Sequence, residues 1–388
     1  MPELRCRAGT SRRGSWLPLA ALALLAGCFG SSGPKMAELP ELRSPIPVRT
    51  LWQASVGSGD RAVLFPIAVG GAVYAAARDG TVARFDAANG REVWRTSAGA
   101  SLGGGVGCDG DLVAVGSEEG EVIALDARSG SIRWRARVSS EVLAPPVVTG
   151  DMVLVRTADT RLFALDAKDG KRRWLYQRAT PSLSVRSPTG VAVSGGIAYA
   201  GFSGGKLVAI SLVNGAPRWE ATVAVPRGAT ELERVADVVG VPVVTEREVC
   251  TAAYQGRVGC FDLATGNPVW SRELSSSSGV GLDAGYLYVS DEKGAVHALD
   301  RANGTSVWKQ DRLSLRRLGA PLPLGREVAV ADVEGYVHLL ARDTGAFVGR
   351  VETDGSPVNA DLVRIDGGFL VQTRDGNVYA LAVQERIP

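Results

Sequence analysis

Residues Gly120–Trp134 read GEVIALDARSGSIRW, and this stretch decides the fold. It predicts a β-strand, a tight turn and a second β-strand. Residues 122–125 place apolar side chains on both faces of the first strand, so both faces are expected to be buried. Asp126 and Gly130 mark the turn, because an Asp carboxylate accepts backbone N–H groups there and a Gly takes a positive φ.

The same unit recurs along the chain with the pattern Gly-x-x-x-x-Φ-Asp-x-x-x-Gly-x-x-x-Trp. Its starts lie near 40 residues apart, at Gly80, Gly120, Thr160, Gly205, Gly256, Gly294, Gly335 and Gly376. The seventh copy has lost the Asp and the Trp, and the chain ends within the eighth. A period of this length with short strands predicts an all-β fold, an eight-bladed β-propeller with four-stranded antiparallel blades.

The eighth repeat lacks its outer strand, and the stretch VRTLWQASVG at residues 48–57 can supply it. A ring closed by this N-terminal strand has no exposed sheet edge. One Trp falls at the same repeat position in seven units: Trp52, Trp94, Trp134, Trp174, Trp219, Trp270 and Trp308. A buried Trp removes about 150–250 Å² from water. We therefore expect these residues to pack blade against blade rather than to bind a ligand.

Residues 1–28 read as a lipoprotein signal peptide, with an Arg-rich start, a short apolar stretch and the sequence Leu-Ala-Gly-Cys at Leu25–Cys28. This sequence predicts that Cys28 is lipidated and becomes the mature N-terminus. The alternative is an ordinary signal peptide with a chance Cys. Phe29, in place of Asp, favours sorting to the outer membrane.

Residues 29–47 are rich in Pro and predict a semi-extended tether, which leaves residues 48–388 for the propeller. One closed ring is one domain, although the length of 388 residues by itself would suggest two or three. The 43 basic and 41 acidic residues are well mixed and give a net charge of +2. This balance provides no basic face of the kind that a nucleic-acid-binding protein needs.

The cysteines leave two interpretations open. Cys250 and Cys260 flank a predicted hairpin turn, and they face each other only if the strand register pairs them directly. An oxidising compartment permits a disulfide there. The alternative, which we favour, is a pair of small buried residues in adjacent strands. Cys108 stands alone in a Gly-rich turn.

No catalytic or metal site is predicted. His297 and His338 lie three residues after the repeat Gly in successive blades, which indicates a repeated structural environment. A metal site needs three or four ligands, and no cluster of Cys, Asp or Glu joins them. Gly99–Gly103 matches G-x-S-x-G, but it lies between two strands and not at a strand-to-helix turn. The repeat Asp residues are expected to cap turns: Asp86, Asp126, Asp166, Asp262 and Asp300.

The repeat is interrupted by two consecutive insertions, in residues 175–190 and 220–241. Both connect one blade to the next, so they are expected side by side on one rim of the ring. The first contains Leu183, Val185 and Arg186, and the second contains Asp237. Apolar residues beside an Arg on a protruding loop are typical of a protein-binding hot spot. The alternative is that both are merely tolerated insertions.

The insertions carry a resemblance to a known family. Residues 181–186 read PSLSVR and residues 230–238 read TELERVADV. Together with the lipobox, the tether and the Trp-containing blades, they resemble the BamB lipoproteins of the β-barrel assembly machinery in Gram-negative outer membranes. In that family the two loops hold the periplasmic POTRA domains of the BamA insertase.

The resemblance implies partner contacts for Leu183, Val185, Arg186 and Asp237. It also implies a lipid-anchored, non-catalytic scaffold at the periplasmic face of the outer membrane, monomeric within a larger complex, that aids unfolded outer-membrane protein clients. No cofactor is implied. Val239 stands where the family has an acidic residue, which puts a contact at that position in doubt.

A more distant resemblance is to the propellers of quinoprotein alcohol dehydrogenases. Their quinone site uses a pair of adjacent cysteines, calcium ligands and a catalytic Asp. This chain has no Cys-Cys pair. A PQQ-dependent dehydrogenase therefore remains the alternative function, together with a generic periplasmic protein-binding propeller.

Overall fold

The computed structural model describes residues 35–179 and 183–384. Cys28 and the rest of the predicted signal peptide lie outside these residues. Among the residues described, no helix has the length and apolar character needed to cross a membrane.

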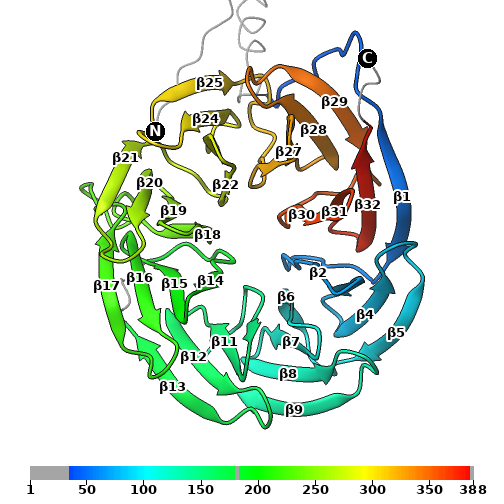
Figure 1. The fold of residues 1–388 in the computed structure, drawn as a ribbon, viewed down its shortest axis with the longest axis vertical. Helices are drawn as coiled ribbons and strands as arrows, with labels where there is room; N and C mark the ends of the chain where they lie inside the picture. Colours follow the sequence, from blue (N-terminus) through cyan, green and yellow to red (C-terminus); the bar gives the residue numbers. More distant parts are fainter. Residues whose placement is uncertain (1–34, 180–182, 385–388) are drawn as a thin grey trace, which may run out of the picture. The chain divides into compact units, whose positions relative to one another are not determined.

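The described strands form eight four-stranded antiparallel sheets, which follow one another around a ring (Figure 1). The prediction of an eight-bladed propeller is confirmed. Blades 1 and 2 contain β2 (Ile67–Val69), β3 (Ala72–Ala76), β4 (Thr81–Asp86), β5 (Glu92–Ser97), β6 (Leu102–Cys108), β7 (Leu112–Ser117), β8 (Glu121–Asp126) and β9 (Ile132–Arg137). Blades 3 and 4 contain β10 (Val147–Thr149), β11 (Met152–Arg156), β12 (Arg161–Asp166), β13 (Arg172–Gln177), β14 (Val191–Ser194), β15 (Ile197–Phe202), β16 (Lys206–Ser211) and β17 (Pro217–Thr222).

The other half of the ring has the same organisation. Blades 5 and 6 contain β18 (Val238–Val244), β19 (Glu248–Ala253), β20 (Arg257–Asp262), β21 (Pro268–Glu273), β22 (Val280–Leu282), β23 (Tyr286–Ser290), β24 (Val296–Asp300) and β25 (Ser306–Gln310). Blades 7 and 8 contain β26 (Leu322–Pro323), β27 (Glu327–Ala331), β28 (Tyr336–Ala341), β29 (Phe347–Glu352), β30 (Val363–Ile365), β31 (Gly368–Gln372), β32 (Asn377–Val383) and β1 (Val48–Ser55).

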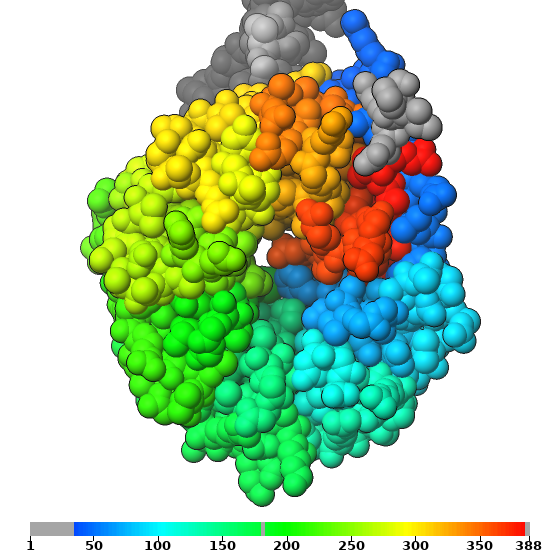
Figure 2. Space-filling view, in the orientation of Figure 1, coloured from blue at the N-terminus to red at the C-terminus, as the bar shows by residue number. Residues whose placement is uncertain are grey.

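The N-terminal strand closes the ring. β1 pairs antiparallel with β32 along its length, from Val48 opposite Val383 to Ser55 opposite Asn377. The first and last strands therefore lie side by side (Figure 1), and Figure 2 shows blue atoms next to red ones there. This confirms the predicted closure and leaves β32 without a free edge.

The blades are apolar on both faces because each face packs against a neighbouring blade. In β8, Ile123 and Leu125 lie in a cluster with residues of blade 1. Val122 and Ala124, on the opposite face, lie in a cluster with residues of blade 3. All four side chains are fully buried. The hydrophobic core is thus divided among the contacts between blades.

Each of the seven repeat Trp residues lies in the outer strand of its blade and contacts the next blade. Trp134 Nε1 donates to the carbonyl oxygen of Ala167 at 2.8 Å, and its ring lies against Gly170. A Cβ at Gly170 would lie 2.6 Å from this ring, and Gly170 has φ +72°. The same donation joins Trp52 to Ala87, Trp94 to Ala127, Trp174 to Leu212, Trp219 to Leu263, Trp270 to Arg301 and Trp308 to Arg342.

The repeat Asp residues cap the turns that these Gly residues complete. Asp126 Oδ1 accepts the backbone N–H groups of Arg128 at 3.0 Å and Ser129 at 2.8 Å. An Asp carboxylate satisfies backbone donors that a tight turn leaves free. Equivalent bonds are made by Asp86, Asp166, Asp262 and Asp300.

Blade 7 has no Trp, and the segment that precedes β1 contacts it instead. Gly349 occupies the Trp position of β29, and the carbonyl oxygen of Ile46 would lie 3.0 Å from a Cβ placed there. Ile46 N–H donates to the carbonyl oxygen of Val348 at 2.7 Å. Earlier in the same segment, the carbonyl oxygen of Pro40 accepts a hydrogen bond from Arg350 of β29 at 2.8 Å. The last part of the Pro-rich stretch is therefore hydrogen-bonded to the propeller.

Cys250 and Cys260 form a disulfide, so the interpretation as two unlinked residues was wrong. β19 and β20 are in the register that places them directly opposite each other, with a Cα–Cα distance of 4.1 Å. That register depends on the turn at Gln255, whose φ is +46°. The alternation of apolar residues in the sequence does not by itself determine which residues of the two strands lie opposite each other. Cys108 is a buried free cysteine in β6.

Candidate functional site

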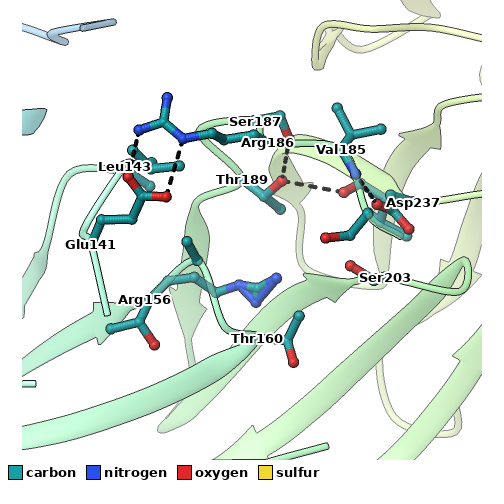
Figure 3. A pocket seen from close by; sticks show the side chains of 15 residues that line it. Glu141, Leu143, Arg156, Thr160, Val185, Arg186, Ser187, Thr189, Ser203 and Asp237 are labelled. Carbon is teal, nitrogen blue, oxygen red and sulfur yellow. Dashed lines mark hydrogen bonds and ion pairs between the residues drawn. The ribbon is translucent and has the colours of Figure 1, made fainter. Parts of the chain in front are cut away.

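The two insertions lie next to each other, as expected. The first runs from residue 178 to 190 between β13 and β14, and the second from 223 to 237 between β17 and β18. Both are shorter than the sequence suggested, because β13 and β17 continue into the predicted insertions and β18 begins within the second. Val185 N–H in the first loop donates to Asp237 Oδ2 in the second at 2.6 Å (Figure 3).

Asp237 holds three segments together. Besides Val185, its Oδ1 accepts the N–H of Gly204, in the turn between β15 and β16, at 3.0 Å. Its own carbonyl oxygen accepts the N–H of Tyr254, after β19, at 2.8 Å. Asp237 is only 4% exposed. Its carboxylate accepts backbone amides of both neighbouring segments, so Asp237 positions the first loop, and its contact with a partner stays a prediction.

Arg186 is paired within the protein, but with Glu141 and not with Asp237. Its Nε donates to Glu141 Oε1 at 3.1 Å, and its Nη2 donates to Oε2 of the same carboxylate (Figure 3). Glu141 lies in the connection between β9 and β10, so this bidentate pair spans 45 residues. The Arg186 side chain is still 61% exposed. Such a fork fixes the orientation of the guanidinium and leaves its outer edge available.

Exposed apolar side chains occur on both loops. Leu183 is 47% exposed on the first loop, and Val185 beside it is partly exposed. The second loop exposes Val225 at 57% and Leu232 at 68%. Large apolar side chains this exposed, grouped with an Arg, are what a partner can cover at an interface.

The second loop has an internal scaffold of hydrogen bonds. Glu233 Oε2 accepts the N–H groups of Ala229 at 2.8 Å and Thr230 at 3.0 Å, and Thr230 Oγ1 accepts the N–H of Glu233 at 3.2 Å. This reciprocal arrangement is a capping box. Bonds from the Thr230 and Ala229 backbone hold the pKa of Glu233 below its usual range. Val235 and Ala236 are buried, so the base of the loop is packed into the propeller.

Val239 is 1% exposed and lies in β18 opposite Ala252. A side chain at this buried position faces the packing between blades. Val239 therefore presents no exposed side chain to a partner.

The two histidines occupy equivalent structural sites. His297 Nε2 lies 2.9 Å from Asp291 Oδ2, and His338 Nε2 lies 2.9 Å from Asp332 Oδ2. His338 Nδ1 accepts from Arg350 Nε at 3.3 Å, so its Nε2 carries the proton. Burial lowers the pKa of His338, and the ring is neutral. The histidines thus bond to carboxylates of their own blades.

Within residues 35–179 and 183–384, one group of potential metal ligands lies close together, namely Glu248, Cys250 and Cys260. The two thiols of this group form the disulfide. Glu248 bonds to Arg301 Nε at 2.5 Å. This group therefore offers no free thiolate to a metal, which requires deprotonated ligands.

Sequence reasoning missed two residues of the loop region. Glu141 was not proposed because nothing in its local sequence links it to Arg186. Leu232 lies between Glu231 and Glu233. An apolar residue between two acidic ones on a predicted loop is a detectable signal of an exposed apolar side chain.

Comparisons with known proteins identify the family of the chain. Residues 78–310 match the family described as "Outer membrane protein assembly factor BamB". A protein of that name from Burkholderia pseudomallei is 40% identical over 93% of this chain and 95% of its own length. Another from Pseudomonas aeruginosa is 44% identical over 94% of this chain and 98% of its own length.

Solved structures show the same fold. The crystal structure of BamB from Moraxella catarrhalis has a TM-score of 0.81 at 29% identity and covers 87% of this chain and 100% of its own. A quinohemoprotein alcohol dehydrogenase from Comamonas testosteroni has a TM-score of 0.67 at 15% identity, over 88% of this chain and 77% of its own, which shows a shared fold alone. The full-length relatives are named as assembly factors and not as enzymes. The chain belongs to the BamB family of outer membrane protein assembly factors.

Proposed function

We propose that the protein is a non-catalytic scaffold that holds the periplasmic POTRA domains of a BamA-like insertase through its two inserted loops. The observation that supports this most directly is the exposed Leu183 beside Arg186, on a loop whose backbone is held by Asp237. The family name places the protein in outer-membrane protein assembly. Within that process, the scaffold aids the folding and insertion of unfolded barrel clients.

The loops have the chemistry of a pre-organised binding surface. Fixing Val185 N–H and the Arg186 guanidinium before binding reduces the entropy lost when the partner docks. Leu183 and the exposed side of Val185 supply apolar area, and Arg186 can donate to a carboxylate or to backbone carbonyls of the partner.

The same proposal includes the anchor and the assembly state. Lipidation of Cys28 would hold the propeller at the periplasmic face of the outer membrane. The protein would act as a single copy within a hetero-oligomeric complex, since the proposed contacts come from one propeller.

The test is co-purification of the insertase with the full-length lipoprotein from its own detergent-solubilised membranes. Leu183→Ala combined with Arg186→Ala is expected to abolish recovery, because loss of a central anchor at an interface costs about 2 kcal/mol or more. The matched control is Val213→Ala with Arg128→Ala. These residues are also exposed, but they lie in turns outside both loops, and they should leave recovery unchanged.

Circular dichroism must show that the double variant is folded before its binding is interpreted. If the folded double variant recovers the insertase at the wild-type yield, the loops do not form the interface. A wild-type protein that oxidises alcohols with added pyrroloquinoline quinone and calcium would instead support the dehydrogenase alternative.

A further inference from the structure

A cavity of about 190 Å³ lies next to the first loop, lined by residues of blades 3 and 4 and of both loops (Figure 3). Arg156, Thr160, Ser203 and Asp237 are among its lining residues. A cavity needs only about 10–15 Å³ of such space to hold a water molecule. This one therefore has room for a small chemical group from outside the protein.

Arg156 departs from the repeat. It is the last residue of β11 and lies opposite Leu162 of β12. In six other blades the residue at this register is small, namely Ala76, Gly116, Gly201, Ala252, Ser290 and Ala331. In the eighth blade it is Gln372, whose amide donates to the carbonyl oxygen of Ala76. Blade 3 alone places a cation at this position.

The Arg156 guanidinium has donors without acceptors. Its Nε and Nη1 have no exposed surface and no hydrogen-bond partner. The guanidinium carbon lies 4.4 Å from the centre of the Phe202 ring, and Figure 3 shows the group pointing into the cavity. Burial lowers the pKa of Arg156 to about 10, although the charges of Asp237 and Asp159 oppose this shift, so Arg156 is still charged at neutral pH. A buried charge of this kind is unfavourable unless something pairs with it.

The carboxylates that line the cavity are already engaged. Glu141 is bound to Arg186, and Asp237 accepts the backbone N–H groups of Val185 and Gly204. Neither makes a hydrogen bond to Arg156. Their negative charge nonetheless opposes the entry of a doubly charged group such as phosphate. A planar, singly charged acceptor matches the guanidinium fork better.

We propose that this cavity receives a carboxylate group, which accepts hydrogen bonds from the Arg156 guanidinium. This inference rests on the proposed function. The carboxylate comes from an Asp or Glu side chain of the partner that docks on Leu183 and Arg186. Docking would then supply the missing acceptor. A free small carboxylate has the same chemistry and is the other source that the experiment distinguishes.

The experiment compares full-length wild-type protein with Arg156→Met, which keeps a flexible, unbranched stem but is shorter and removes the guanidinium and its charge. Arg156→Met is expected to lower recovery of the insertase roughly tenfold or more. Its melting temperature should be unchanged or higher, because the variant removes a partly buried charge whose Nε and Nη1 have no hydrogen-bond acceptor. Arg156→Lys, which keeps a positive charge, should recover more of the insertase than Arg156→Met and less than the wild type. The matched control is Gln372→Met, at the same register in blade 8, which should leave recovery unchanged.

A second arm uses sodium glutarate as the probe, with sodium chloride at equal ionic strength as the reference. If Arg156→Met keeps the insertase, but glutarate raises the melting temperature of the wild type and not of Arg156→Met, the site takes a free carboxylate. If recovery is unchanged and glutarate has no specific effect, the proposal is overturned. Arg156→Met could also lose the insertase and have a lower melting temperature, with neither restored in Arg156→Lys. That result would assign a structural role to Arg156 and would also overturn the proposal.

The loop variant separates this inference from the proposed function. If Leu183→Ala with Arg186→Ala loses the insertase while Arg156→Met retains it, the loop interface stands and the carboxylate from the partner is excluded. If the loop variant itself retains the insertase, the proposed function fails, and the glutarate arm alone decides whether the cavity binds a carboxylate.

Discussion

At the scale of the residue, the contact between blades depends on pairs of one Trp and one Gly. Trp134 lies against Gly170 of the next blade and donates to Ala167 of the same turn. The Gly serves two purposes there, because it takes a positive φ and leaves room for the ring. The same pairing of Gly and Trp recurs around the ring. In each pair the Gly both forms its own turn and makes room for the Trp, which for Trp134 and Gly170 lies 36 residues away.

Gly170→Ala is expected to destabilise the protein more than Gly150→Ala. Both residues have a positive φ, but nothing lies within 4 Å of a Cβ at Gly150, whereas a Cβ at Gly170 meets Trp134. Gly150→Ala should lower the free energy of unfolding by about 1–2 kcal/mol through backbone strain alone. Gly170→Ala should add about 1–3 kcal/mol for the steric conflict. Urea unfolding followed by circular dichroism measures both, and equal losses would show that the Trp ring is not packed there.

His338 predicts a dependence of stability on pH. Its pKa is lowered in the folded protein by burial, whereas the unfolded value is about 6.5. Below that pH the unfolded chain binds a proton that the folded ring resists, so stability is present above about pH 6.5 and falls as the pH drops through the folded pKa. Asp332 does not add to this effect near neutrality. Burial raises its pKa, but bonds from His338 and Arg316 outweigh burial and hold it below the usual acidic range.

The measurement is the urea midpoint at pH 7.5 and pH 5.5 for wild type, His338→Gln and the matched variant His297→Gln. The wild type and His297→Gln are expected to lose stability on acidification, and His338→Gln should lose less. The comparison concerns the change with pH and not the absolute stability, since either substitution can be destabilising. Identical changes in all three proteins would contradict a titrating role for His338.

At the scale of the element, β1 completes blade 8 and joins it to blade 1. Its backbone pairs with β32, and Trp52 Nε1 donates to the carbonyl oxygen of Ala87 at 2.8 Å. The segment before β1 contacts blade 7 through Ile46, where Gly349 takes the place of a Trp. One N-terminal stretch therefore contacts three blades around the point of closure.

Deletion of residues 48–56 should lower the melting temperature sharply and cause aggregation. The deletion exposes the edge of β32, and an unpaired edge strand is a template for pairing with another chain. Trp52→Ala serves as the control, because it removes the side-chain contact but keeps the strand, and it should destabilise without aggregation. An unchanged melting temperature in the deletion variant would show that β1 does not maintain the ring.

At the scale of the whole molecule, the ring presents two loops from adjacent blade connections, and the described chain enters it through the segment before β1. The loops belong to the connections on either side of blade 4, and the N-terminal segment contacts blade 7. The loops proposed to bind the partner and the segment that follows the predicted anchor therefore contact different blades of one propeller.

Cys28→Ser is expected to release the protein from the outer membrane. Among residues 35–179 and 183–384, no helix is long and apolar enough to cross a membrane. The proposed attachment therefore depends on the lipid at Cys28. Fractionation of cells that express the variant at the native level measures this. A variant that still sediments with outer membranes as the wild type does would show that attachment does not require lipidation.

The sequence by itself determined the propeller, the number of blades, the closing strand and the position of the insertions. These features are local or periodic. A strand, its turn and its Trp occupy 15 consecutive residues in Gly120–Trp134, and repetition near every 40 residues leaves one architecture that buries both faces of every strand.

Only the tertiary structure decided which side chains meet across blades. Arg186 pairs with Glu141 across 45 residues, Asp237 holds the backbone of Val185 across 52, and the disulfide depends on the register between β19 and β20. Arg156 becomes notable only once the strand register shows small residues at the same position in six other blades and the fold leaves its Nε and Nη1 without acceptors. The physical reason is that hydrogen bonding and burial depend on neighbours in space, and in a propeller those neighbours lie one blade away along the chain.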